Sequence, residues 1–209
     1  MQVKKEELRQ RLLDAAGGEF REKGFNGASL REIAQRAKVT KGALYPYFAN
    51  KGALFQALTA PARETVSAMF ARAEDQSLWA ARDTMGMAER RETVLESFRQ
   101  FAREVLAQRD SFRLLLLCNR WEDYRQYKES VILAYEKRFD QIFPWFVPAQ
   151  RRNVRVSQVF IHTMASLFFS YIEELILHNV SPEEGDAYAE EMALFALSGA
   201  EKLSDRGEI

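Results

Sequence analysis

Residues 29–51 carry a dense set of groups that can donate hydrogen bonds or positive charge to an anion. Hydroxyl, ammonium and phenol groups occur there beside one glycine, at Ser29, Thr40, Lys41, Gly42, Tyr45, Tyr47 and Lys51. Side chains of these types are common partners of nucleic-acid phosphates and sugars. A glycine lets the protein backbone approach a bound molecule closely. The set therefore predicts a surface that contacts double-stranded DNA.

Charge is unevenly distributed along the chain. The whole sequence holds 30 basic and 30 acidic residues, but residues 1–51 hold 11 Lys and Arg against 6 Asp and Glu, a net charge of +5. Residues 52–209 are acidic by the same margin. A basic unit joined to an acidic remainder indicates that the N-terminal part meets a polyanion.

Two short helices must position these side chains. A capping box begins the first, over 29–37, because the Ser29 hydroxyl can accept from the Glu32 amide and Glu32 can reach back to the Ser29 amide. Thr40 can cap the second, over 41–48, after a tight turn at 38–39. The apolar residues Leu44, Phe48 and Leu54 are expected in a small core. This arrangement is typical of a helix-turn-helix, whose second helix enters the major groove of DNA.

The same segment resembles a known family. The resemblance is to the DNA-binding domain of the tetracycline-repressor (TetR) family, covers about residues 5–55, and rests on 29–34 and 39–48 with Lys51 and Leu54. It implies an all-helical dimer with a ligand pocket in its C-terminal domain, in which an effector moves the fourth helix and separates the two recognition helices. By position, it also implies that the seven residues named first contact a palindromic DNA operator.

Two residues depart from the family pattern. Lys38 stands in the turn where the family usually has glycine, and a positive φ there would cost a lysine about 1–2 kcal/mol. Either a phosphate contact compensates for this strain or the turn differs slightly. Pro46 stands where the family often has histidine or another polar or aromatic residue. Because proline lacks an amide donor and bends or ends a helix, we expect no DNA contact from position 46.

The rest of the chain is also predicted to be helical, so the fold class is all-α. A three-helix helix-turn-helix domain is expected at 1–51, and a larger ligand-binding and dimerisation domain at 52–209. Apolar periodicity places the other helices at 4–22, which Gly24 can end with a left-handed cap, and at 51–72, 87–108, 110–118, 122–143, 152–178 and 182–203. A second capping box, Ser181–Glu184, marks the start of the last helix.

The last two helices are expected to pair with a second copy of the chain. The middle of the 152–178 helix, Val159–Phe169, is apolar on most sides, which a helix with one side in water cannot be. The next helix carries small residues such as Ala193, Gly199 and Ala200, which let a neighbouring helix approach closely. A four-helix bundle between two copies explains both patterns. The alternative is that both helices are central in a monomer.

Aromatic residues are concentrated in the C-terminal part, where 52–209 hold 20 of the 25 in the chain. They suit either a large core or an apolar ligand pocket, and at helical spacing each could belong to either. The favoured ligand-binding residues are Phe112, Trp121, Phe160, Met164 and Phe168, from a wider set that includes Phe98, Phe101, Leu116, Tyr124 and Tyr135. The expected effector is a small apolar or amphipathic molecule.

The sequence argues against catalysis and against a membrane span. Neither histidine has a glutamate three residues before it, so a di-iron carboxylate site is not expected, and no Gly-rich phosphate loop or nucleophile elbow occurs. The longest apolar run, Leu114–Cys118, is too short for a bilayer, no secretory signal is recognisable, and a single cysteine suits a reducing compartment.

These features predict a cytoplasmic repressor that an effector releases from DNA, with no cofactor, no metal and no enzymatic activity. The alternative function is that of a helical DNA-binding co-regulator without a small-molecule ligand.

Overall fold

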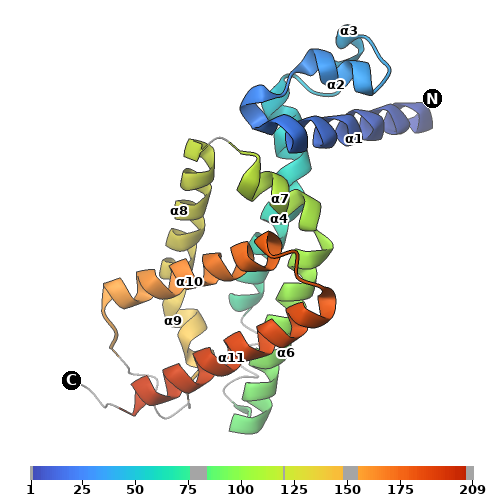
Figure 1. Cartoon of the computed structure of the whole chain (residues 1–209). Coiled ribbons are helices and arrows are strands. Elements are labelled where there is room, and N and C mark those ends of the chain that lie inside the picture. The colour runs from blue at the N-terminus through green and yellow to red at the C-terminus, as the bar shows by residue number, and fades with distance from the viewer. Residues whose placement is uncertain (1, 76–83, 120, 148–154, 206–209) are drawn as a thin grey trace. The chain divides into compact units, whose positions relative to one another are not determined.

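The computed structural model describes residues 2–75, 84–119, 121–147 and 155–205, and every regular element within these ranges is a helix (Figure 1). The predicted all-α class is confirmed. The chain groups into two compact units, which are described separately. Unit 1 contains Met1–Glu64 and Gln108–Gln126, and unit 2 contains Thr65–Ala107 and Tyr127–Ile209. The functional boundary at residue 51 stays a prediction.

Unit 1 holds the predicted helix-turn-helix. Its elements are α1 (Gln2–Gly27), α2 (Leu30–Arg36), α3 (Lys41–Leu44), the first part of α4 (Lys51–Ala73), α7 (Arg109–Leu117) and the start of α8 (Trp121–Lys137). Leu12 of α1, Ile33 of α2 and Leu44 of α3 are fully buried in one core, and Leu54 of α4 joins them. Burial of each such side chain contributes about 1.5–3 kcal/mol. The predicted core positions Leu44, Phe48 and Leu54 are confirmed.

Gly24 interrupts α1. Its φ of 64° is positive, as the predicted cap requires, but its ψ of 175° is extended, so the residue occupies a region that is essentially limited to glycine. The Phe25 amide then donates to the Cys118 carbonyl at 2.7 Å. The Phe25 ring packs against Phe20 and Phe55, with ring centroids 5.9 and 5.2 Å away. The break therefore turns Phe25 inward.

The recognition helix α3 is shorter than the sequence predicts. The expected helix over 41–48 ends at Leu44, and residues 45–47 form turns. The reason is Pro46, which has no amide hydrogen to continue the helical ladder. The Tyr47 and Phe48 amides both donate to the Leu44 carbonyl, at 3.0 and 3.1 Å, which closes the segment before α4.

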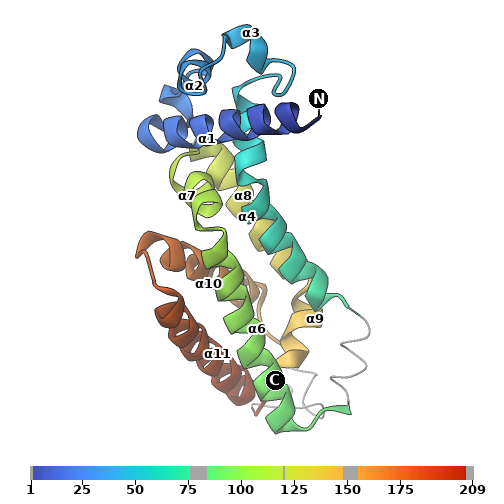
Figure 2. The same cartoon turned by 90° about the vertical axis from the view of Figure 1, so that its right-hand side faces the viewer.

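Unit 2 contains the remaining helices. They are α6 (Met87–Ala107), α9 (Phe139–Ile142), the 3-10 helix η1 (Phe143–Trp145), α10 (Gln158–Leu177) and α11 (Pro182–Ser204), together with the ends of α4 and α8. Figure 2 shows α6 and α11 side by side. Arg103 pairs with Asp186 at 2.7 Å and Arg99 with Glu190 at 2.8 Å across this contact. Gly185 permits it, because a Cβ there would lie 2.6 Å from Leu106 Cδ1.

Two predicted helix boundaries in unit 2 are wrong. The helix expected over 122–143 breaks at Arg138, whose φ and ψ are −106° and 2°, and the new direction lets Phe139 stack on Phe143 at 5.0 Å. The helix expected from 152 begins at Gln158, because Ser157 caps it by accepting from the Phe160 amide at 3.2 Å. Residues 152–154 lie outside the described residues. The capping box at Ser181 and Glu184 is confirmed.

Candidate nucleic-acid interface

α3 presents several of the predicted DNA-contact residues to solvent. Thr40, Lys41 and Gly42 are exposed at its start, and the Tyr45 side chain, which follows its last residue, is 46% exposed. Lys41 and Tyr45 are four residues apart, a spacing that places two side chains on the same side of a helix. Leu44 is fully buried and fixes the opposite side to the core. We call Thr40, Lys41, Gly42 and Tyr45 the recognition face.

Two hydroxyl groups cap the two helices of the motif. Ser29 Oγ accepts a hydrogen bond from the Glu32 amide at 3.2 Å, and Thr40 Oγ1 accepts one from the Ala43 amide at 3.3 Å. Each hydroxyl satisfies a helix amide with a lone pair and keeps its own proton for donation. A phosphate oxygen accepts such a proton, so capping and DNA contact are compatible at both positions.

Glu32 has a different partner from the one that the sequence predicts. Its carboxylate pairs with the Lys23 ammonium rather than returning to the Ser29 amide. The hydrogen bond between the two side chains lowers the pKa of Glu32 and raises the pKa of Lys23. Only half of the predicted capping box forms: the Ser29 hydroxyl accepts from the Glu32 amide, but the Glu32 carboxylate pairs with Lys23 of α1 and does not bond to the Ser29 amide.

A buried carboxylate connects α1 to α2. Glu19 is fully buried, and its two oxygens lie 3.1 Å from Lys23 Nζ and 3.1 Å from Arg36 Nε. Arg36 also bonds to Glu22, which lowers the pKa of the Glu22 carboxyl and raises the pKa of the guanidinium. These ion pairs hold α2 against α1, and they give the charges of Lys23 and Arg36 partners inside the protein.

Tyr47 and Lys51 are placed differently from the recognition face. The Tyr47 side chain is partly buried and packs against the core of unit 1. Lys51 Nζ donates to the carbonyls of Ala28 and Asn26, at 2.8 and 3.3 Å, and lies 4.8 Å above the Phe25 ring. Lys51 therefore supports the segment that leads into Ser29, and its contact with DNA stays a prediction.

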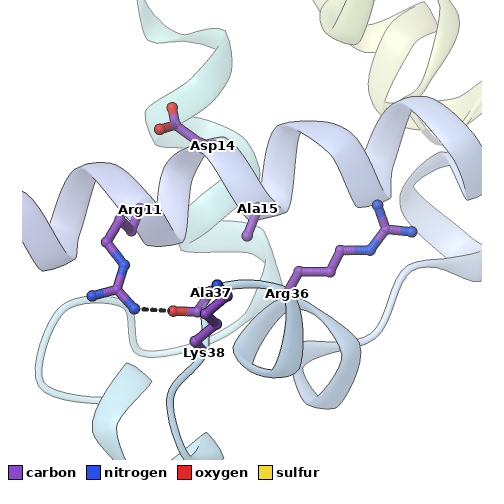
Figure 3. A pocket seen from close by; sticks show the side chains of 6 residues that line it. All are labelled: Arg11, Asp14, Ala15, Arg36, Ala37 and Lys38. Atoms are coloured by element: carbon purple, nitrogen blue, oxygen red, sulfur yellow. Dashed lines mark hydrogen bonds between the residues drawn. The ribbon is translucent and has the colours of Figure 1, made fainter.

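α1 and the turn between α2 and α3 border a hollow of about 500 Å³. Figure 3 shows the residues that line it, Arg11, Asp14, Ala15, Arg36, Ala37 and Lys38. The Arg11 guanidinium donates to the Ala37 carbonyl, which immediately precedes Lys38. The sequence drew attention to Lys38 through its place in the turn. It gave no signal for Arg11, because only the fold brings α1 to this turn.

The cations of residues 29–51 fall into two groups. Arg36 and Lys51 are engaged with carboxylates or carbonyls of the protein. Within the part of the chain that the structure describes, Arg31, Lys38 and Lys41 make no ion pair or hydrogen bond through their charged groups. The charge available to an outside anion is therefore concentrated on α2, the turn and α3.

Acidic side chains, histidines and Cys118 are the groups that bear on metal and thiol chemistry. No group of three or more His, Cys, Asp or Glu suited to a metal ion occurs within the described residues. Cys118 packs against the core of unit 1, and burial raises the pKa of its thiol. A reactive cysteine needs the opposite shift.

The predicted ligand-binding residues are divided between the two units. Phe112 is buried in unit 1, and Trp121 begins α8, but its side chain lies outside the described residues. Phe160, Met164 and Phe168 are partly buried and follow each other at intervals of four along α10 in unit 2. Their role in ligand binding stays a prediction.

Phe168 lies within an aromatic cluster of unit 2. Its ring centroid is 5.5 Å from Phe101, 6.0 Å from Tyr135 and 6.1 Å from Phe70. Tyr171, which the sequence did not single out, lies beside Phe101 with ring centroids 6.4 Å apart and is 2% exposed. Its hydroxyl has no hydrogen-bond partner within the described residues, and burial raises its pKa. The cluster is therefore mainly aromatic, and the Tyr171 hydroxyl is a buried polar group beside it.

α10 and α11 also expose large apolar side chains. Val159 is 76% and Phe195 is 68% exposed, and Leu167 is exposed between them in sequence. A Cβ at Gly199 would meet no heavy atom within 4 Å. α10 is long and apolar enough to cross a membrane by length and composition, a test that core helices of soluble proteins also pass. Apolar side chains as exposed as these are candidates for contact with another molecule.

Comparisons with known proteins agree with this geometry. A family described as "Bacterial regulatory proteins, tetR family" matches residues 12–58. The probable HTH-type transcriptional regulator ArpR of Pseudomonas putida is 27% identical over 174 residues, which cover 82% of this chain and 79% of that protein.

Solved structures share the fold along most of the chain. A TetR-like transcriptional regulator from Rhodococcus sp. RHA1 superposes with a TM-score of 0.60 at 19% identity, covering 92% of this chain and 96% of that one. NalD, the secondary repressor of the MexAB-OprM multidrug efflux pump in Pseudomonas aeruginosa, gives a TM-score of 0.57 at 18% identity, with 93% and 97% covered. At these identities the likeness is one of fold: an N-terminal helix-turn-helix followed by a helical domain.

Proposed function

We propose that this chain, which belongs to the TetR family of transcriptional regulators, is a cytoplasmic, non-enzymatic repressor. In this proposal it binds a palindromic operator as a homodimer and leaves the DNA when a small apolar or amphipathic effector binds. NalD, described as a repressor of an efflux pump, supports repression by analogy of fold.

The observation that carries the proposal is the recognition face. The residues that carry its hydroxyl, ammonium and phenol groups are exposed to solvent around one helical turn, and the buried Leu44 packs the opposite side of that turn into the core. The Lys41 ammonium has no partner within the described residues, so no internal ion pair must break before it meets a phosphate. A short helix that is fixed on one side and polar on the other suits insertion into a major groove.

The exposed apolar side chains of α10 and α11 support the homodimer. A second copy of the chain would bury Val159, Leu167 and Phe195, and the absence of a side chain at Gly199 would let the partner helix approach closely. A two-fold interface also gives two recognition helices, which read half-sites about 34–36 Å apart.

The aromatic cluster around Phe168 supports an effector that is largely apolar. Its rings offer dispersion contacts, and the Tyr171 hydroxyl offers one hydrogen bond that the described residues do not use. The co-regulator without a ligand is the second candidate. A thermal-shift screen of apolar and amphipathic compounds distinguishes the ligand-released repressor from the co-regulator. A compound that both stabilises the protein and releases DNA supports the repressor, and a screen that finds no such compound favours the co-regulator.

The DNA-binding proposal is tested by selecting duplexes from a random library with the purified full-length protein. We expect an inverted repeat to be enriched, and we expect Lys41→Ala to weaken binding to it and to make the salt dependence shallower by about 0.9 for each lost phosphate contact. Lys137→Ala, at an exposed lysine of α8, removes the same charge and should leave both quantities unchanged. Failure to enrich any sequence, or equal affinity for wild type and Lys41→Ala, would count against the proposal.

A further inference from the structure

Lys38 adopts a backbone conformation that is unusual for its residue type. Its φ is 56°, in the left-handed region, where a Cβ meets the backbone and glycine is preferred. Asn179 is the other non-glycine residue with a positive φ within the described part of the chain, and asparagine tolerates this region well. Strained residues of this kind are concentrated at functional sites, so Lys38 calls for an explanation of its side chain.

The surrounding hydrogen bonds hold the turn in this shape. The Lys38 amide donates to the Gln35 carbonyl and the Val39 amide donates to the Ala34 carbonyl, both at 3.0 Å. The Arg11 guanidinium donates to the Ala37 carbonyl from the other side of the hollow. Three bonds therefore fix the backbone of Lys38 at the end of α2, and none of them involves its side chain.

Two cations of the hollow, Lys38 and Arg11, have no carboxylate partner among the described residues. Arg36 forms ion pairs with Glu19 and Glu22. Asp14 keeps its negative charge, because its partner Gln10 is neutral, and Figure 3 shows its side chain on the side of α1 away from Lys38. The Lys38 side chain is exposed, and no hydrogen bond or ion pair of its ammonium occurs within the described residues. Arg11 keeps further N–H donors beyond the one that it gives to Ala37.

We propose that Lys38, with Arg11 beside it, binds a phosphate of the DNA backbone in this hollow, outside the recognition face. Lys38 lies two residues before Thr40, so a duplex that contacts the start of α3 passes close to the hollow. A phosphodiester group of the DNA backbone carries one negative charge and can accept hydrogen bonds from the Lys38 ammonium and from the remaining N–H donors of Arg11. The inference rests on the proposed DNA-binding function and adds a phosphate contact to it.

The test uses three substitutions at one position and a labelled duplex of random sequence of about 30 base pairs, because non-specific binding reports phosphate contacts. Lys38→Gly removes the charge and the backbone strain, Lys38→Ala removes the charge alone, and Lys38→Arg keeps the charge. Lys137→Ala in α8 is the matched control for the loss of one exposed cation. Affinity is measured by fluorescence anisotropy over a range of salt concentrations, and stability by thermal unfolding.

We expect Lys38→Gly to raise the unfolding midpoint and at the same time to weaken binding. Its salt dependence should become shallower by about 0.9 for each Lys38 that contacts a phosphate. Lys38→Ala should show the same loss of binding without the gain in stability, and Lys38→Arg should bind as wild type does. Arg11→Ala should also weaken binding, because it releases the Ala37 carbonyl and removes a second donor.

Three results overturn the inference. A more stable Lys38→Gly with an unchanged salt dependence would show that the lysine acts on the turn alone. Stabilisation by inorganic phosphate at matched ionic strength, lost in Lys38→Ala while DNA binding stays intact, would assign the hollow to a free anion. If wild type binds no duplex even at low salt, the proposed function fails and this inference fails with it. That outcome is distinct from the first two, in which wild type binds.

Discussion

The Ser111 hydroxyl is inserted into α4 beside Pro61, and its Oγ lies 2.8 Å from the Leu58 carbonyl oxygen. Ser111 Oγ donates to that carbonyl and also accepts a hydrogen bond from the Ala62 amide at 3.1 Å. Leu58 and Ala62 are four residues apart, the spacing of a helical hydrogen bond, so a side chain of α7 bridges two groups of the helical ladder. A proline and an inserted side chain are the usual causes of a bend in a helix.

Ser111→Ala should destabilise the protein by about 1–3 kcal/mol, because it leaves a buried backbone amide and a carbonyl without their partner. Chemical denaturation followed by circular dichroism measures the effect. Ser97→Ala is the control, since the Ser97 hydroxyl bonds to the Thr93 carbonyl on an exposed helix surface. Equal effects of the two substitutions would contradict the bridging role of Ser111.

Arg36→Ala should destabilise the protein more than removal of an exposed ion pair does, because Glu19 is fully buried and keeps only Lys23 as a partner. Urea denaturation compares it with Lys202→Ala, which removes an exposed pair with Asp205 and should cost well under about 1 kcal/mol. The prediction fails if Arg36→Ala is no more harmful than its control.

Acid should weaken unit 1 through Glu22 and Glu32. Hydrogen bonds from Arg36 and Lys23 lower the pKa of these two carboxyls below the ordinary value of 4.5. A lowered pKa in the folded state means that the unfolded chain binds protons first. The stabilisation is therefore complete above pH 4.5 and disappears as the pH falls through the folded-state values. Thermal midpoints between pH 7 and 3 measure it, and the double variant Glu22→Gln, Glu32→Gln should show a flatter profile than wild type.

Tyr171→Phe should leave the stability unchanged or raise it by about 1 kcal/mol, because the Tyr171 hydroxyl is buried without a partner within the described residues. The same substitution should weaken binding of any effector that bonds to this hydroxyl. Thermal unfolding with and without an effector found by screening measures both quantities. A clear loss of stability in the unliganded variant would show that the hydroxyl has a structural partner.

Phe195→Glu should convert the proposed dimer to a monomer, since the 68% exposed ring would be replaced by a charge within the interface. Light scattering after size-exclusion chromatography gives the mass. Leu133→Glu, at an exposed leucine of α8, is the control and should remain dimeric. A wild-type chain that is monomeric at every concentration would remove the basis for two-fold operator binding.

Local hydrogen bonding explains which parts of this protein could be predicted from its sequence. Ser29, Thr40 and Ser181 each cap a helix within three residues of themselves, so their contribution depends on adjacent residues alone. The position of the helix-turn-helix, the burial of Leu44 and the unusual turn at Lys38 follow from the same short-range pattern. Pro46 could also have predicted the early end of α3, because its missing amide is a property of the residue itself.

The tertiary structure decided everything that depends on residues far apart in the chain. Lys23 pairs with the Glu32 carboxylate, which therefore does not complete the capping box, and Arg36 pairs with the buried Glu19. The Ser111 hydroxyl bonds to backbone groups of α4. The hollow beside Lys38 needs Arg11 from another helix. Ion pairs and hydrogen bonds act over a few ångströms of space whatever the separation in sequence. Periodicity and capping therefore determine where helices lie, and the packing of those helices decides which charges remain available to DNA.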